Sequence, residues 1–72
     1  MDDAIGKNIK DARIKRGLLQ ADLAEKIGVN QKDISNWERG VKIPGSENLK
    51  KICIALQVSA DDILGIRLES GK

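Results

Sequence analysis

The sequence lacks several residue types, and each gap narrows the range of possible proteins. Its 72 residues include no histidine and a single cysteine, Cys53. An intramolecular disulfide is therefore excluded, and a Cys/His zinc site has no ligand set. Phenylalanine and tyrosine are also missing, and Trp37 is the one aromatic residue. The core must be built from Ile, Leu, Val and Ala, which pack well between short helices.

Long apolar runs are missing as well. No stretch approaches the roughly 20 residues that a helix needs to span a bilayer. The start, Met1-Asp2-Asp3, has neither the positive charge nor the apolar run of a secretory signal. A chain of this size has room for one modest core and not for a large catalytic cleft. No pairing of a nucleophile with a base is evident, so we expect a soluble cytoplasmic protein that is not an enzyme and has no metal, cofactor, membrane partner or small-molecule substrate.

The net charge of +2 is weakly basic, which permits nucleic-acid binding without requiring it. The segment from Lys7 to Arg16 carries five basic residues against Asp11 alone, whereas Asp61 and Asp62 fall near the other end. Taken by itself, a basic run of this kind favours a solvated helix face over a binding surface.

Apolar residues recur at helical spacing along the whole chain, and no useful alternating segment indicates a strand. Glycines end most of these segments, and Asp2 or Asp3 can cap the first. The expected helices cover about 3–16, 20–27 and 31–39, a stretch from about 47 to 56, and a short segment after a capping box at 59–62. We predict a compact all-α domain of five helices over residues 1–66 and a C-terminal tail over 67–72.

The segment from Gln20 to Glu38 has the residue types of a tight helical hairpin. Ala24 is small where two helices must approach closely, and Gly28 allows a sharp turn between them. Val29 and Ile34 can fill the angle between helices that cross steeply. This segment therefore predicts a helix-turn-helix.

Its residues closely resemble the lambda repressor and Cro-like helix-turn-helix family, also called the XRE family. Arg13, Gly17, Leu18 and Pro44 also fit that pattern, and the resemblance extends from about Ile5 to Gly65. The core of the motif is Gln20-x-x-Leu23-Ala24-x-x-Ile27-Gly28-Val29-x-x-x-x-Ile34-Ser35-x-Trp37-Glu38-x-Gly40. Three positions depart from the family: Leu19 replaces the usual Thr or Ser cap, Ser46 an apolar residue, and Gln57 a glycine.

The resemblance implies that the third helix enters the major groove. Gln31, Lys32 and Asn36 are then the base-contacting residues, with Asp33 and Ser35 close enough to assist. The side-chain chemistry agrees, because Gln and Asn can bond to adenine, Lys can donate to guanine and Asp can accept from cytosine. The alternative is an ordinary solvated helix face, which such residues form in most helices.

The same resemblance implies phosphate contacts and a structural ion pair. Gln20 lies at a helix start, where backbone N–H groups also attract anions. The full set of expected phosphate contacts is Gln20, Asn30, Arg39 and Lys42, with a helix-start role or plain surface charge as the alternatives. Arg13 and Glu38 are expected to pair and to fix the third helix on the scaffold.

Two residues could have a functional role, but the sequence favours a structural role for each. Trp37 could stack on a base, but its spacing from Ile34 favours the core. Cys53 could sense redox state, but it lies in the apolar stripe of the fourth helix, which favours a small buried residue.

We expect a transcriptional regulator, a repressor of the phage or mobile-element type, that binds a double-stranded DNA operator in a sequence-specific way as a homodimer on two half-sites. Ile63, Leu64, Ile66 and Leu68 are the expected interface. The alternative function is a protein-interaction module, such as an antitoxin-like or anti-repressor partner that uses the same scaffold.

Overall fold

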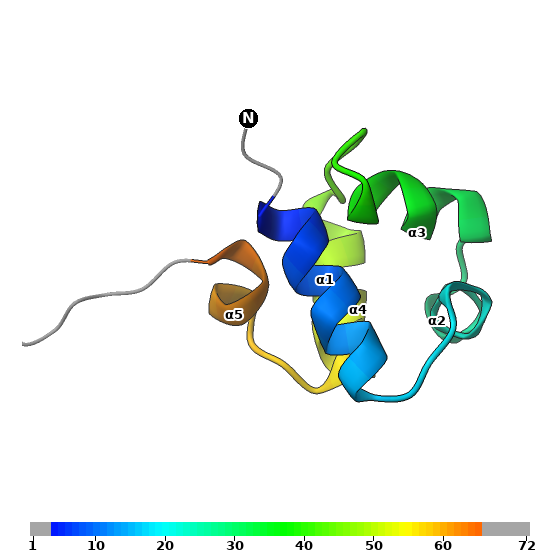
Figure 1. Cartoon of the computed structure of the whole chain (residues 1–72), viewed down its shortest axis with the longest axis horizontal. Coiled ribbons are helices and arrows are strands. Elements are labelled where there is room, and N and C mark those ends of the chain that lie inside the picture. The colour runs from blue at the N-terminus through cyan, green and yellow to red at the C-terminus, as the bar shows by residue number, and fades with distance from the viewer. Residues whose placement is uncertain (1–3, 66–72) are drawn as a thin grey trace, which may run out of the picture.

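The computed structural model describes residues 4–65, which form five α-helices and no strands (Figure 1). The all-α fold expected from the sequence is confirmed. The expected cap at Asp2 or Asp3, the tail over 67–72, and the interface residues Ile66 and Leu68 lie outside the described residues. The helices are α1 (Ala4–Lys15), α2 (Gln20–Ile27), α3 (Gln31–Glu38), α4 (Ser46–Leu56) and α5 (Ala60–Leu64).

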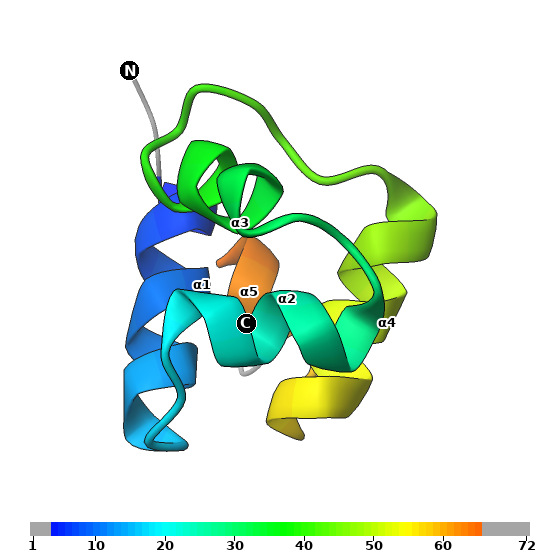
Figure 2. The same ribbon diagram turned by 90° about the vertical axis from the view of Figure 1, so that its right-hand side faces the viewer.

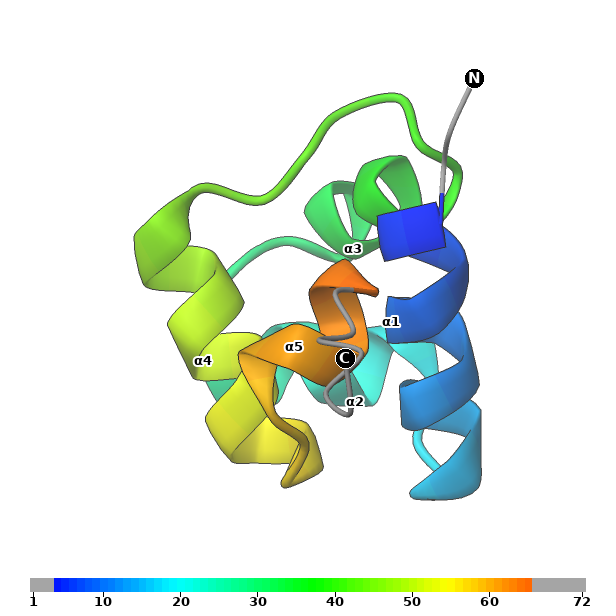
Figure 3. The ribbon, with the colours of Figure 1, turned by 90° about the vertical axis from the view of Figure 1, so that its left-hand side faces the viewer.

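The helices enclose one core, with the hairpin of α2 and α3 at one end and α5 at the other (Figure 1). α3 packs on α1 and α2, while α2 also packs on α4. Figure 2 shows α2 lying across the end of the molecule, with α3 above it and the α3–α4 loop arching over the top. Seen from the opposite side in Figure 3, α5 fills the space between α1 and α4.

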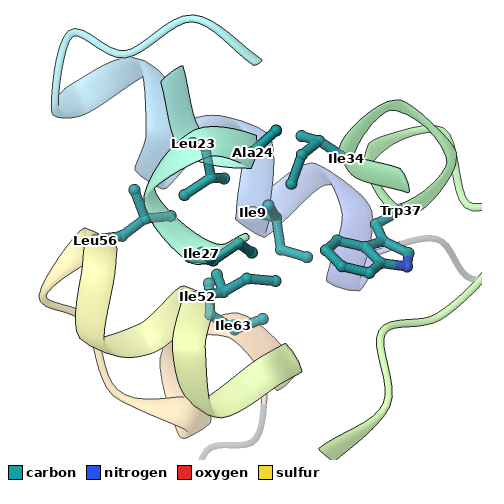
Figure 4. Packing of buried hydrophobic residues seen from close by; sticks show 9 residues of the cluster. All are labelled: Ile9, Leu23, Ala24, Ile27, Ile34, Trp37, Ile52, Leu56 and Ile63. Carbon is teal, nitrogen blue, oxygen red and sulfur yellow. The ribbon is translucent and has the colours of Figure 1, made fainter. Parts of the chain in front are cut away.

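The core is almost entirely aliphatic, as the composition requires (Figure 4). All five helices contribute to it, which explains how helices of 5 to 12 residues are held in a fixed arrangement. Trp37 is only 6% exposed and belongs to this core, as its spacing predicted. The buried hydrophobic residues are Ile9, Leu23, Ala24, Ile27, Ile34, Trp37, Ile52, Leu56 and Ile63.

The expected interface role of Ile63 is wrong. Its side chain is 1% exposed and lies in the core, because α5 is wedged between α1 and α4 and turns this residue inward. The side-chain amide of Asn8 donates to the carbonyl oxygen of Ile63 at 3.0 Å, which ties α5 to α1. Leu64, the other described residue of the expected interface, is half-buried.

Cys53 is half-buried and packs against the core. Burial, helped by the negative charge of Asp62, raises the pKa of its thiol. A protonated thiol is a poor nucleophile, so the environment suits a packing residue more than a redox sensor.

Two residues of the basic run from Lys7 to Arg16 are used within the fold. Arg13 is buried, and Arg16 donates to the carbonyl oxygen of Leu56 at 2.8 Å, at the end of α4. Lys7 forms an exposed pair with Asp11 at 3.4 Å. Only part of the run is therefore a solvated face. In the described range, no helix is long and apolar enough to cross a membrane.

Candidate nucleic-acid interface

The turn between α2 and α3 is built from local backbone bonds. Gly28 adopts a left-handed conformation at φ 79°, which glycine tolerates better than other residues. Its N–H and that of Val29 both donate to the carbonyl oxygen of Ala24, at 2.8 and 3.0 Å. Asn30 then resumes an extended conformation and precedes α3. Residues 28–30 thus form the turn that sets α3 against α2, as the motif predicted.

Only one of the two reciprocal hydrogen bonds of a capping box forms at the start of α3. Asp33 Oδ2 accepts from the backbone N–H of Asn30 at 3.2 Å, whereas the Asn30 side chain makes no cap hydrogen bond. Part of the Asp33 carboxylate is therefore committed to the helix start. That commitment counts against Asp33 as a base contact, and it leaves the exposed Asn30 side chain available to a phosphate.

α3 presents two chemically different faces. Ile34, Trp37 and Glu38 are buried against the scaffold. Gln31 and Lys32 are exposed. The remaining polar residues of the helix, Asp33, Ser35 and Asn36, are half-buried. Every residue that the sequence proposed for base contact therefore lies on the polar side of α3.

The ion pair expected between Arg13 and Glu38 is present and holds the end of α3 against α1. Arg13 Nε lies 2.6 Å from Glu38 Oε2, and Nη2 lies 3.0 Å from Oε1, so two parallel bonds join the groups. The third guanidinium nitrogen donates to the carbonyl oxygen of Leu18 at 2.7 Å. Both side chains are at most 10% exposed. Within the described residues, no buried side-chain nitrogen or oxygen lacks a partner.

Gln20 extends this pair toward the polar face of α3. Its Nε2 donates to Glu38 Oε1 at 3.0 Å, and its Oε1 accepts from Gln31 Nε2 at 3.4 Å. The amide of Gln20 is thus held between Glu38 and Gln31. A contact from Gln20 to phosphate would have to use its second amide hydrogen or its backbone. The sequence did not reveal this bridge, because it joins residues 11 and 18 positions apart through side-chain amides.

The loop after α3 carries the other expected phosphate contacts. The N–H groups of Val41 and Lys42 both point to the carbonyl oxygen of Asn36, at 2.9 and 3.3 Å, so the chain stays close to the helix end. Lys42 is exposed, and its side chain forms no bond within residues 4–65. Arg39 is also exposed but folds back onto α3, where it bonds to Ser35 and Asn36. The sequence missed these two bonds, because they depend on side-chain conformations.

The arrangement suits recognition of a charged, grooved surface. The described residues contain no group of three or more His, Cys, Asp or Glu side chains that could hold a metal. The polar side of α3 offers amide, hydroxyl and ammonium groups, which are the groups that read base edges. Cations from the following loop stand beside it, where a phosphate backbone would run.

A helix-turn-helix family model matches residues 9–63 of the chain. The chain is 37% identical over 62 residues to the HTH-type transcriptional regulator ImmR of Bacillus subtilis, covering 86% of this chain and 49% of ImmR. It is 36% identical over 61 residues to antitoxin PezA of Streptococcus pneumoniae, covering 85% of this chain and 39% of PezA. The chain therefore spans half or less of these two relatives.

A solved structure is similar over most of the described fold. It is the crystal structure of the c2 repressor of Salmonella phage P22 in complex with a synthetic operator. The TM-score is 0.79 at 39% sequence identity, and the match covers 82% of this chain and 89% of that one.

Proposed function

The chain belongs to the helix-turn-helix family, and on that premise we propose that it binds double-stranded DNA in a sequence-specific way and regulates transcription as a repressor. In this proposal α3 lies in the major groove. The observation that carries it is the division of α3 into a buried face, fixed by Ile34, Trp37 and the Arg13–Glu38 pair, and a polar face open to solvent. A recognition helix needs both properties: a rigid support and free hydrogen-bonding groups. The similarity to the operator-bound c2 repressor supports the same assignment.

We assign base contacts to Gln31, Lys32 and Asn36, with Ser35 beside them, and a lesser part to Asp33. Asn30 and Lys42 are assigned to phosphates, because both are exposed and their side chains form no bond within residues 4–65. Two further contacts to the DNA backbone come from Arg39 and from Gln20 at the start of α2. The side chains of both residues also bond within the protein.

We propose that the protein acts as a homodimer on two half-sites about 34 Å apart, within the cytoplasm. One domain of this size reaches too few base pairs to find a single operator in a genome, so a second copy supplies the missing specificity. Light scattering of the protein with a two-half-site duplex and with a single half-site tests this stoichiometry.

Selection of binders from a pool of random duplexes, followed by sequencing, tests the proposed activity. The enriched duplex and a scrambled one are then compared by fluorescence anisotropy. We expect Asn36→Ala to weaken binding to the enriched duplex by about 1–3 kcal/mol and to leave the scrambled duplex unaffected. Lys15→Ala is the matched control, since it alters an exposed residue at the C-terminal end of α1 and should change neither affinity. Equal losses on both duplexes for Asn36→Ala would contradict base reading.

The similarity to an antitoxin supports a second candidate, in which the scaffold binds another protein. The salt dependence of binding affinity distinguishes DNA binding from protein binding. When a protein binds DNA through several phosphates, condensed counterions are released. The logarithm of the affinity then falls steeply and linearly with the logarithm of the salt concentration. A nearly flat plot, together with no enriched duplex, would favour the protein-binding module.

A further inference from the structure

The side chain of Arg39 lies across the polar side of α3 instead of extending into solvent. Its Nη2 donates to Asn36 Oδ1 at 2.9 Å, and its Nε donates to Ser35 Oγ at 3.2 Å. The backbone supports this position, because Arg39 is the C-cap of α3 and its N–H donates to the carbonyl oxygen of Ser35 at 3.0 Å. One guanidinium thus holds two of the side chains proposed to meet bases.

These bonds decide which atoms of Asn36 and Ser35 remain available. A guanidinium can only donate, so the amide atom that faces it must be the oxygen. The NH₂ group of Asn36 is then left to face outward as a donor. Ser35 already accepts through Oγ, and its hydroxyl hydrogen remains free to donate. The Asn36 oxygen has a second lone pair, but the adjacent positive charge disfavours the approach of another N–H donor.

The neighbouring side chains reinforce this donor character. Lys32 lies one helical turn before Asn36 on the same face, and its ammonium group forms no bond within the described residues. The carboxylate of Asp33, the residue next to Lys32 in the sequence, has one oxygen bound to the N–H of Asn30. The surface formed by Lys32, Ser35 and Asn36, which we call the donor face, therefore displays N–H and O–H groups.

We propose that Arg39 is a positioning residue that sets base specificity: by holding the oxygens of Asn36 and Ser35, it makes the donor face select guanine and reject adenine. Guanine presents two acceptors, O6 and N7, in the major groove, whereas adenine presents an N6 amine beside its N7. That amine would meet the outward NH₂ of Asn36, donor against donor, and one of the two groups would stay unpaired. Free of Arg39, the Asn36 amide could instead bond to adenine through both of its atoms. The inference rests on the proposed DNA-binding function.

A plain phosphate contact by Arg39 predicts a different result from this positioning role. Loss of a phosphate contact weakens binding to all sequences about equally. Loss of the positioning bonds changes which base is preferred at the position that Asn36 reads. Lys42 is the matched control, because it is an exposed cation of the same loop whose side chain forms no bond to α3 within the described residues.

The experiment repeats the duplex selection with the wild-type chain and with Asn36→Ala, Arg39→Ala, Lys42→Ala and the double variant. The base position whose frequencies change in Asn36→Ala is the position that Asn36 reads. There we expect the wild-type protein to prefer guanine over adenine by about fivefold to 150-fold in affinity. We expect Arg39→Ala to reduce that ratio to about threefold or less, and Lys42→Ala to retain it while binding every duplex more weakly. Arg39→Ala should have no further effect on the ratio at this position in the Asn36→Ala background, because Arg39 acts there through its bond to Asn36.

Two results would overturn the inference while leaving the proposed function intact. The first is a wild-type preference for adenine at the Asn36 position. The second is an Arg39→Ala variant that binds all duplexes more weakly but keeps the wild-type base frequencies, as a phosphate contact would. A wild-type selection that enriches no sequence would instead refute the proposed function, and the inference with it. Circular dichroism melting of each variant shows whether the fold is intact.

Discussion

Gly6 lies directly against the backbone of Trp37, where α1 crosses the end of α3. A Cβ built on Gly6 would overlap the carbonyl oxygen of Trp37 and would lie 2.6 Å from that of Glu38. Both obstacles are backbone atoms, which cannot move aside as a flexible side chain could. The position of α3 on the scaffold therefore depends on the absence of a side chain at Gly6 in α1.

Gly6→Ala should accordingly destabilise the protein, although alanine is the better helix former. Overpacking of this kind costs about 1–3 kcal/mol. Gly45→Ala is the control, because a Cβ there meets nothing within 4 Å and φ is −68°. We expect its effect to stay below about 1 kcal/mol, the loss from a poorer N-cap. Chemical denaturation of both variants measures the difference, and a Gly6→Ala variant as stable as Gly45→Ala would contradict the close approach.

Glu38→Ala should be strongly destabilising, because it leaves the buried Arg13 guanidinium without its charge partner. Removing one member of a buried pair typically costs about 3–5 kcal/mol. Asp11→Ala breaks the exposed pair with Lys7 and is the matched control. Its effect should be below about 1 kcal/mol. Thermal melting compares the two variants, and equal melting temperatures would show that the buried pair does not hold the fold.

Most of the fold could be predicted because local signals agree with one another. Gly28, Gly40 and Gly65 all have positive φ and stand just beyond the helices that spacing predicted. The error at Ile63 has a physical cause as well. A helix of five residues has too few positions to define an apolar stripe, so the sequence could not show which side of α5 faces the core.

The site was predicted less completely than the fold. Helical spacing correctly separated Ile34 and Trp37, which are buried, from Gln31 and Lys32, which are exposed. Spacing carries no information on rotamers, however, so the bonds from Arg39 to Asn36 and Ser35 could not be foreseen. Those bonds determine whether an amide presents a donor or an acceptor, and hence which base it prefers.

Leu19→Thr should stabilise the protein by restoring a cap at the start of α2. Leu19 has the extended conformation of an N-cap, and its N–H donates to Asp22 Oδ2 at 2.9 Å, but its side chain has no acceptor to offer in return. A threonine hydroxyl can accept from the N–H of Asp22, which is worth about 0.5–2 kcal/mol. Leu19→Val is the control, since valine has the shape of threonine without the hydroxyl. If both variants melt at the same temperature, the added cap does not form.

The reactivity of Cys53 should depend on pH in a way that reports its surroundings. Its pKa is raised by burial and by the charge of Asp62, so the reactive thiolate forms at higher pH in the folded protein than in the unfolded chain. Alkylation by iodoacetamide, followed by mass spectrometry across a pH series, measures this. We expect the rate profile of the native protein to lie at higher pH than that of the chain in denaturant. Coincident profiles would show that the thiol is not shielded.

Gln57→Gly should stabilise the protein, which is unusual for a change to glycine. Gln57 ends α4 in the left-handed conformation, at φ 58° and ψ 47°, and it is the one described non-glycine residue with a positive φ. That conformation costs an L-residue about 1–2 kcal/mol, part of which is offset because glycine loses more backbone entropy on folding. Gln57→Ala is the control, since it removes the side chain but keeps the Cβ that causes the strain. We expect the glycine variant to be more stable than the alanine variant by about 1 kcal/mol in urea denaturation. Equal stabilities would mean that the Cβ of Gln57 causes no strain at the end of α4.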